Sequence, residues 1–254
     1  MFQLCPLPSS SLLDRQMHVF LDEFREPVAI KDSQLCYQYA NAAYAQLLRV
    51  SQLKSLLGHS DVELCTFSSA LRKHFQQRDN EVLSSLNPYE SVLLLQEQGQ
   101  MHGYWHQRRP LLNSHYQVLG VVLTATALGH LDWMPTLDKQ IDTRTLYKAT
   151  SYTLVDKDEL LNENELIVLF FLLRLGSFSA IAAHSDFPLA KIHTHMRSLY
   201  SKFHCQTKKI LIKKAIDKGY WFYIPKAIFA RYCPTPQEAL PWPSAARVTL
   251  PSVP

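Results

Sequence analysis

The chain has 254 residues, of which 47% are hydrophobic, and a formal net charge of +4 with a pI of about 8.7. This length predicts two domains at roughly 100–150 residues each, and the small net charge excludes a protein that is strongly basic throughout. The five cysteines are odd in number and form no Cys-x-x-Cys pair, which disfavours a disulfide framework and a structural zinc site. The start lacks a secretory pattern, and no apolar run reaches the roughly 18 residues that span a bilayer, so we expect a cytoplasmic protein without a membrane partner.

The first predicted elements are a helix and a hairpin. Residues 12–24 place apolar side chains at helical spacing between charged ones, which predicts an amphipathic helix. Residues 27–31 and 36–40 are rich in β-forming side chains and flank a turn at Asp32. They predict two strands that pair as a hairpin.

Helices and three more strands follow. Asn41 predicts the N-cap of a short helix over residues 42–48, and a longer helix over 71–86 is stopped by Asn87 and Pro88. Three strand-like runs, typical of consecutive antiparallel strands, come next: 89–96, 101–109 and 118–127.

This order of elements within residues 12–127 resembles the PAS sensor family. Four short motifs carry the resemblance: Pro27-Val28-Ala29-Ile30-Lys31-Asp32, Tyr39-Ala40-Asn41-Ala42-Ala43, Gly58 with Asp61, and Arg109-Pro110-Leu111-Leu112 ahead of Gly120-Val121-Val122. The resemblance implies an α+β domain in which helices pack on one face of a five-stranded antiparallel sheet. Many PAS domains enclose a small-molecule cavity there, and the alternative is a solid core that only dimerises.

Candidate ligand-binding residues follow from the alternation of side chains along strands. In the run 101–109, one face carries Tyr104, His106 and Arg108 and the other carries Trp105 and Gln107. The sequence leaves open which face lines a cavity, and His106 with Arg108 could hydrogen-bond a polar ring or a carboxylate. The aromatic candidates on other elements are Tyr37, Tyr39, Phe67 and Phe75, whose alternative role is core packing.

We expect no cofactor and no metal. His74, the candidate haem ligand on the longer helix, has the charged and amide neighbours of a solvated face. Cys65 does not lie in the Asn-Cys-Arg-Phe-Leu-Gln run of flavin light sensors. His193, His195 and His204 occupy different azimuths of one predicted helix, which disfavours a metal site.

Two segments lack the patterns of a folded domain. Residues 128–158 hold alternating charges and few β-formers, which predicts a linker that is helical over 137–150. Residues 232–254 carry six of the fourteen prolines, which predicts a Pro-rich tail that cannot continue a helix.

Positive charge is concentrated in the last third of the chain. Between residues 187 and 226 a single acid, Asp217, stands against nine basic residues: Lys191, Arg197, Lys202, Lys208, Lys209, Lys213, Lys214, Lys218 and Lys226. A field of one sign on a folded surface attracts polyanions, nucleic acids among them.

Four helices are predicted over residues 161–219. The first begins at a capping-box pair, Asn162 and Glu165, and ends at Gly176. The second covers residues 179–184 and is rich in alanine, which allows a close approach to its neighbour.

The third helix, residues 188–203, has two distinct faces, and the fourth covers residues 207–218. The apolar face of the third carries Leu189, Ile192, Met196, Leu199 and Phe203. The opposite face carries small and hydrogen-bonding residues: Ala190, Lys191, Thr194, Arg197, Ser198 and Ser201. Such a face suits a helix that enters the major groove of DNA.

The segment 159–222 resembles the LuxR-type (GerE-like) helix-turn-helix. The motifs that carry the resemblance are Leu161-Asn162 with Glu165, Val168-Leu169, Gly176, Ile181-Ala182, Ile192-His193-Thr194-His195, and Ser201-Lys202-Phe203 before Thr207. The chain departs from the family at Pro188, which replaces a Ser/Thr cap, and at Ser185, which replaces a Leu. The resemblance implies an all-α DNA-binding domain whose last helix pairs two subunits.

Together the resemblances imply the PAS–LuxR class of bacterial one-component regulators, which includes quorum-sensing receptors and regulators of the TraJ type. We expect a homodimeric transcription regulator that senses a small cytoplasmic ligand, for which an autoinducer is one candidate, and that binds double-stranded DNA. The residues expected at DNA are Lys191, His193, Thr194, Arg197, Ser198, Ser201, Lys202, Lys208 and Lys209.

Two alternatives stay open for the sensory half. One is a ligand-free PAS regulator controlled by protein partners or by its abundance. The other is an acyl-homoserine-lactone receptor of the LuxR type, whose spacing of Trp, Tyr and Asp is not evident here. An enzyme is not expected, because the sequence has no nucleophile elbow, P-loop or paired-metal motif.

Overall fold

The computed structural model describes residues 13, 15–64, 67–97, 100–129 and 148–233, and divides them into two compact units. The first unit comprises the described residues up to Gly129 together with 148–150, and the second comprises 151–233. Within these ranges no single helix is long and apolar enough to cross a membrane, although two helices at residues 163–184 meet that test as a pair bent by 120°.

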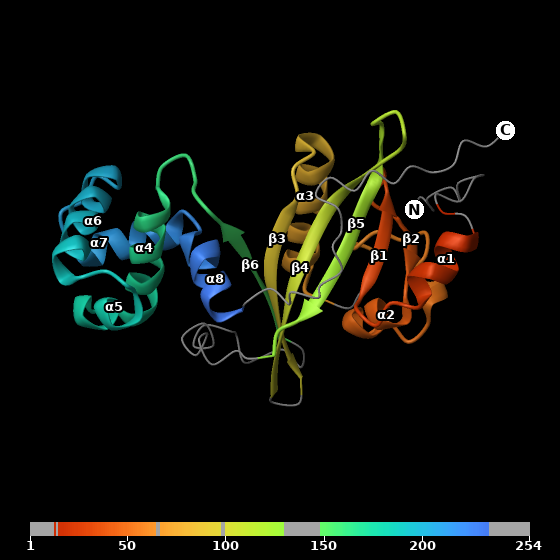
Figure 1. The fold of residues 1–254 in the computed structure, drawn as a ribbon, viewed down its shortest axis with the longest axis horizontal. Coiled ribbons are helices and arrows are strands. Elements are labelled where there is room, and N and C mark those ends of the chain that lie inside the picture. The colour runs from red at the N-terminus through yellow and green to blue at the C-terminus, as the bar shows by residue number, and fades with distance from the viewer. Residues whose placement is uncertain (1–12, 14, 65–66, 98–99, 130–147, 234–254) are drawn as a thin grey trace. The chain divides into compact units, whose positions relative to one another are not determined.

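The first unit is built on five antiparallel strands (Figure 1). They are β1 (Val28–Asp32), β2 (Tyr37–Ala40), β3 (Tyr89–Glu97), β4 (Gln100–Leu112) and β5 (Val118–Ala127). Their spatial order is β2-β1-β5-β4-β3, so β1 lies between β2 and β5, although β5 comes almost 90 residues later. The strands that the sequence predicted are thereby found, each within three residues of its expected ends.

Two further strands correct the predicted count. They are β6 (Lys148–Val155) and β7 (Tyr223–Pro225), so the described residues hold seven strands where five were predicted. Within the second unit, β7 pairs in parallel with β6 from Thr153 to Val155. The sequence predicted an all-α domain here, and this pair of strands shows that the second unit is not all-α.

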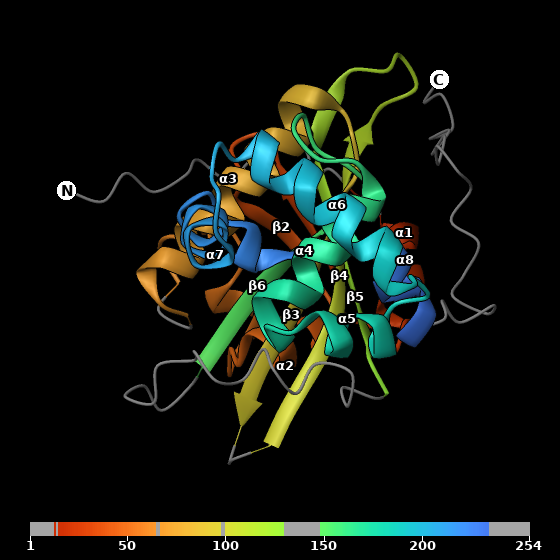
Figure 2. The ribbon, with the colours of Figure 1, turned by 90° about the vertical axis from the view of Figure 1, so that its left-hand side faces the viewer.

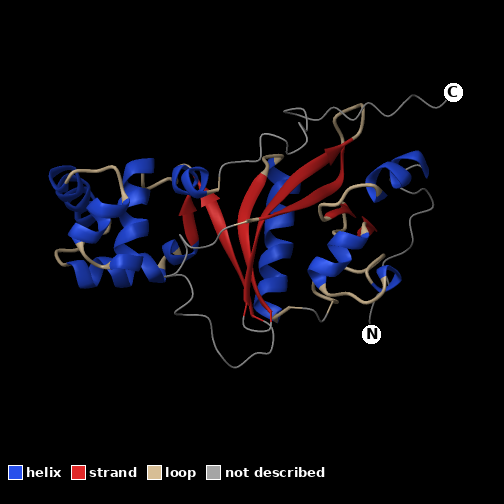
Figure 3. Ribbon diagram, turned by 60° about the horizontal axis from the view of Figure 1, so that its bottom comes forward, coloured by secondary structure: helices blue, strands red, loops and turns tan. Residues whose placement is uncertain are grey.

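Helices cover the sheet of the first unit from both sides. They are α1 (Arg15–Asp22), α2 (Ala42–Leu48), a 3-10 turn η1 (Leu53–Ser55) and α3 (Ser69–Ser85). Asn41 caps α2 by accepting from the backbone N–H of Tyr44, as predicted. Helix α3 packs on one face of the sheet, against β4 and β5 (Figure 3). Helix α1 packs on the other face, against Val28 and Ile30.

A β-bulge separates two tyrosines that the sequence had placed together. In the β1–β2 ladder Ile30 pairs with Tyr39 and Lys31 pairs with Tyr37, so Gln38 is an extra residue. Alternating side chains share a face only where no residue is inserted. Tyr37 therefore packs on the α3 side with the main core, whereas Tyr39 packs on the α1 side.

The second unit contains the predicted helices and some unpredicted elements. The helices are α4 (Glu163–Leu175), α5 (Phe178–His184), α6 (Leu189–Lys202) and α7 (Lys208–Asp217), followed by η3 (Tyr220–Phe222), β7 and α8 (Lys226–Tyr232). Both hydrogen bonds of the capping box join Asn162 and Glu165, and Gly176 ends α4 with a φ of 72°. Helices α4, α5 and α6 pack against one another (Figure 2).

The predicted linker contains part of this structure. Its expected helix over 137–150 is a strand at its last three residues, which belong to β6, and the rest of that helix lies outside the described residues. Most of the predicted Pro-rich tail also lies outside them. In the described part of the chain Cys36, Cys205 and Cys233 form no disulfide with one another.

Candidate functional site

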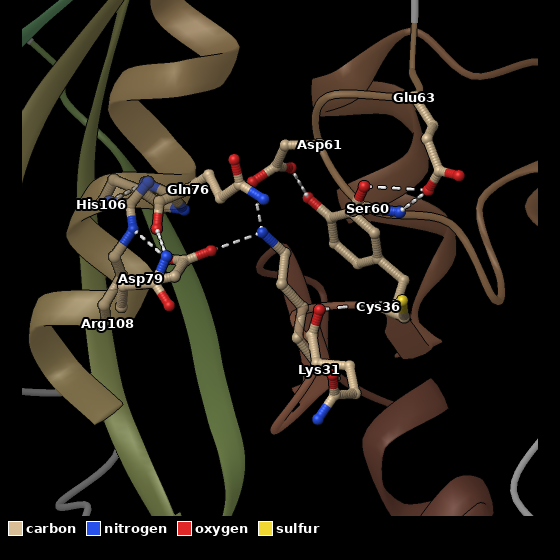
Figure 4. A network of polar contacts seen from close by, with 12 residues as sticks. Lys31, Cys36, Ser60, Asp61, Glu63, Gln76, Asp79, His106 and Arg108 are labelled. Atoms are coloured by element: carbon tan, nitrogen blue, oxygen red, sulfur yellow. Dashed lines mark hydrogen bonds and ion pairs between the residues drawn. The ribbon is translucent and has the colours of Figure 1, made fainter. Parts of the chain in front are cut away.

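The first unit buries a network of charged side chains between α3 and the sheet (Figure 4). Lys31 Nζ pairs with Asp61 and lies 2.6 Å from Asp79 Oδ2, while Arg108 Nε donates to Asp79 Oδ1 at 2.7 Å. Arg108 Nη1 lies 2.9 Å from His106 Nδ1. None of these five side chains is more than 5% exposed.

The network ties together segments that are far apart in sequence. Lys31 comes from β1, His106 and Arg108 from β4, and Asp79 from α3, whereas Asp61 lies in the loop between η1 and α3. Two cations stand against two carboxylates, so the network carries no net charge when His106 is neutral. A buried charge is tolerated only when it is paired and hydrogen-bonded, and each of these charges meets that condition.

The carboxylates hold both cations in their charged state. Burial alone would lower the pKa of Lys31, but Asp61 and Asp79 outweigh it and raise that pKa above its ordinary value. Burial would likewise lower the pKa of Arg108, but Asp79 outweighs it, and the pKa is raised above its ordinary value. Neither side chain can therefore act as a neutral amine or guanidine.

Two tyrosines, Tyr37 and Tyr44, lie near Lys31 and Asp61. Tyr37 donates to Asp61 Oδ1 at 2.6 Å, and its ring lies 4.6 Å below Lys31 Nζ. Burial, and then Asp61, raise the pKa of Tyr37 well above its ordinary value. Burial also raises the pKa of Tyr44 to about 12, so both phenols stay protonated.

His106 leaves one nitrogen without a partner. A guanidinium can only donate, so His106 Nδ1 accepts from Arg108 and the ring proton lies on Nε2. Burial, followed by the charges of Arg108 and Lys31, lowers the pKa of His106 well below its ordinary value, which keeps the ring neutral. Its Nε2–H is buried and has no hydrogen-bond partner among the described residues. The rings of Phe75 and Tyr44 lie 6.0 and 6.4 Å away.

The other predicted ligand-binding residues divide between the two sheet faces. Tyr104 and Phe67 pack at the margin of the core that contains Phe75, and Phe67 meets Phe75 edge-on at 5.9 Å. Tyr39 does not join them, because the bulge turns it to the α1 side, where its hydroxyl donates to Asp22 Oδ1 at 2.7 Å. Tyr37 and Tyr39 were both predicted to line a cavity, and the bulge places them on opposite faces of the sheet.

The sequence reasoning missed the acidic half of the network and Lys31. A signal for Asp79 was present, because it lies on the apolar stripe of α3 between Phe75 and Val82, both of which are buried. A carboxylate on a core stripe requires a buried cation nearby. Asp61 gave no comparable signal, since it lies in a loop.

A second candidate site is the outer face of α6. Its exposed predicted residues are Lys191, His193, Thr194, Arg197 and Ser201, and α6 contains no acidic residue. A four-residue turn, 185–188, joins α5 to α6, as in a helix-turn-helix.

Local contacts hold several of these side chains on that face. Lys191 Nζ lies 4.2 Å from the ring centre of Phe187, and the ring of His193 meets Phe178 edge-on at 5.0 Å. Thr194 Oγ1 donates to the carbonyl of Ala190 at 3.0 Å.

Two predicted DNA contacts are turned toward α4 instead. Ser198 Oγ donates to Glu165 Oε1 at 2.6 Å, and Lys202 Nζ lies 2.7 Å from Glu165 Oε2. Burial would raise the pKa of Glu165, but its bonds from Lys202, Ser198 and the Asn162 backbone outweigh burial and lower it. Because Ser198 and Lys202 lie at the edge of the outer face, Glu165 can reach both and join α6 to α4.

Three other residues near this face differ in their contacts. Lys208 Nζ donates to the carbonyl of Gly176 at 2.8 Å, so it caps the end of α4, while Lys209 is exposed. Leu189 was expected on the buried stripe but is 48% exposed. It is the first residue of α6, and the buried stripe begins at Ile192.

Comparison with known proteins bears on the first unit. A family model of the PAS fold matches residues 21–130. This part of the chain has a PAS-like α+β fold. The PAS region therefore contains α1 from Leu21 onward, the five antiparallel strands and the buried network. No curated protein matches the chain in sequence.

Solved structures of VqmA are similar in layout to 85% of the chain. The Vibrio cholerae VqmA dimer in the absence of target DNA is 22% identical, with a TM-score of 0.44, and the match covers 85% of this chain and 93% of that one. VqmA bound to DPO is 21% identical with a TM-score of 0.42 over 85% and 93% of the two chains. The PAS domain of Bordetella pertussis BvgS is 16% identical with a TM-score of 0.42 over 47% and 88%.

In the described part of the chain, no group of three or more His, Cys, Asp or Glu residues is placed so that it could hold a metal ion.

Proposed function

We propose that the chain is a DNA-binding transcription regulator in which α6 reads the major groove and the PAS region binds a small, uncharged molecule. The observation that carries the DNA half is the outer face of α6, where Lys191, Thr194, Arg197 and Ser201 are exposed on a helix without acids. An arginine can pair with guanine through two hydrogen bonds, while small neighbours let the helix approach the bases.

The DNA half is tested by binding to duplexes selected from a random pool, measured by fluorescence anisotropy at several salt concentrations. Arg197→Ala should weaken binding by about 1–3 kcal/mol and relax the base preference at one position. Lys209→Ala should weaken all sequences alike and reduce the salt slope by about one. Lys54→Ala, an exposed lysine of the PAS region, is the matched control and should bind like the wild type. Equal binding and equal base preference of Arg197→Ala and the wild type would refute the assignment of α6.

The ligand half rests on the unpaired Nε2–H of His106. A buried donor without a partner costs about 1–3 kcal/mol, so a molecule that offers an acceptor there is favoured. Since the charges of Lys31 and Arg108 are already matched by carboxylates, a charged ligand would find no counter-charge of its own. The proposed ligand is therefore neutral, carries a ring nitrogen or carbonyl oxygen, and lies among Phe75, Tyr44 and His106.

The ligand half is tested by native mass spectrometry of the full chain purified from rich medium. We expect a bound neutral species in the wild type and its loss in His106→Phe, which removes the donor but keeps an apolar ring. His115→Phe, at an exposed turn of the β4–β5 hairpin, is the control and should keep the species. An apo mass for the wild type, with no shift in Tm on adding a metabolite extract, would instead favour a regulator controlled by partners or abundance.

Homodimer formation is part of the proposal and gives the regulator a means of control. A ligand can alter DNA binding only if it prefers one arrangement of the dimer over another. Sedimentation of the chain with and without duplex DNA measures the subunit count, and a monomer on DNA would contradict this part.

A further inference from the structure

Leu189 is an exposed apolar side chain in the first turn of α6, at the edge between the buried stripe and the exposed face. It is 48% exposed and is the first residue of the helix, next to the exposed Ala190 and Lys191. Among the described residues, the other strongly exposed large hydrophobic side chains of the second unit lie on α7 and η3. A single exposed leucine is common on protein surfaces, so its exposure alone assigns no role.

The place of Leu189 in the helix-turn-helix gives it a role. The second helix of this motif contacts base edges with the residues of its N-terminal part. Leu189 directly follows the turn at Pro188, and Arg197 lies two turns further along the same helix. The side chain therefore belongs to the N-terminal part of α6, which is the part that meets base edges in this motif.

A leucine has no donor or acceptor, and this limits what it can recognise in the major groove. The apolar group that the groove displays is the C5-methyl of thymine, whereas the other bases present donors and acceptors at their edges. Covering such a polar edge with a leucine removes it from water without a hydrogen bond, which is unfavourable. The small side chain of Ala190 leaves room for a close approach.

We propose that Leu189 determines base specificity by packing on the C5-methyl group of a thymine, and so selects against a G·C pair at that position. This inference rests on the proposed DNA binding by α6 and adds the base that one residue reads. It predicts that the preferred site contains one thymine whose methyl group is required.

The test replaces each thymine of the selected duplex, one at a time, by deoxyuridine, which lacks only that methyl group. The full chain should lose about fourfold in affinity at a single position, as expected for one buried methyl group. Leu189→Ala should bind the thymine duplex several-fold more weakly and show no further loss with deoxyuridine at that position. Leu189→Met, which keeps an apolar side chain, should remain sensitive.

Ile210→Ala is the matched control, because it removes a similarly exposed aliphatic side chain from α7. It should keep the full sensitivity to deoxyuridine. If the wild type binds every deoxyuridine duplex like the thymine duplex, or if Leu189→Ala keeps the fourfold difference, the inference is wrong. The deoxyuridine scan of the wild type needs no variant, so a folding defect cannot obscure it.

Failure of this inference can be distinguished from failure of the proposed function. If Arg197→Ala weakens binding while Leu189→Ala stays sensitive to the methyl group, DNA binding by α6 is supported and the role of Leu189 is refuted. If neither substitution changes binding to any duplex, both the assignment of α6 as the DNA-binding helix and the role of Leu189 are refuted.

Discussion

Asp79 is the carboxylate that joins both cations of the buried network, and its neutralisation gives the sharpest test of that network. Asp79→Asn keeps the shape of the side chain but removes the charge that Arg108 Nε meets at 2.7 Å and Lys31 Nζ meets at 2.6 Å. Lys31 retains Asp61, so the variant leaves the network with one excess positive charge in a site where both cations are 1% exposed.

The expected cost follows from this unpaired charge. Removing one partner of a buried ion pair typically costs about 3–5 kcal/mol, because the remaining charge stays out of water. The whole stability of a domain is about 5–15 kcal/mol, so the PAS region should lose a large fraction of its own. The loss should be concentrated where Asp79 fastens α3 to β1 and β4.

The assay is urea unfolding of the full chain, combined with hydrogen exchange of β4 amides to assign the transition to the PAS region. Glu81→Gln on the same helix is the matched control, since its pair with Arg78 at 2.6 Å is 23% and 43% exposed and is expected to contribute about 0–1 kcal/mol. If Asp79→Asn costs no more than Glu81→Gln, the network does not carry the charges as paired ions and the reasoning fails.

Three further predictions concern single residues. Glu165→Gln keeps the capping geometry but loses the charge that holds Lys202. It should lower the free energy of unfolding by about 1–2 kcal/mol and weaken DNA binding. Glu163→Gln, at an exposed position of the same helix, should do neither. A Cβ at Gly120 would lie 1.8 Å from the carbonyl oxygen of Lys31, so Gly120→Ala should lower Tm by several degrees or prevent folding, and an unchanged melting curve would contradict the register. Because the pKa of His106 is lowered in the folded chain, stability should fall as pH drops below about 6.5, by up to about 1.4 kcal/mol per pH unit. Urea unfolding of His106→Asn between pH 7 and 5 should show a shallower slope, and an equal slope would contradict the burial of a neutral ring.

The sequence predicted the elements whose signals are local. A capping box and a terminal glycine define α4 within 15 residues of chain, and the alternation of β-formers defines β3, β4 and β5. The strand β7 has only three residues and pairs with β6, some 70 residues earlier. No nearby residue indicates such a partner, so the aromatic run before Pro225 could not be assigned to a strand from its own pattern.

The network was less predictable because each of its members is ordinary by itself. A lysine in a short strand and an aspartate in a loop are typical surface residues. Lys31 and Asp61 can be buried because they pair with each other and Lys31 also pairs with Asp79. The position of Tyr39 was equally hard to predict. One inserted residue, Gln38, reverses its face, and no residue type marks that bulge in the sequence.

Salt should separate the two candidate sites, because their charges are placed differently. In the network both cations are in contact with carboxylates and shielded from water, so mobile ions cannot reach them. On α6 the exposed Lys191 and Arg197 have no acid on their helix, and their field extends over about 10 Å at 0.1 M salt. Raising salt from 50 to 200 mM should therefore lower DNA affinity by about tenfold or more if two phosphates are neutralised. The stability difference between Asp79→Asn and the wild type should not change over the same range. If that difference shrinks with salt as the DNA affinity does, the network is open to solvent ions and its charges are not held as a buried, balanced set.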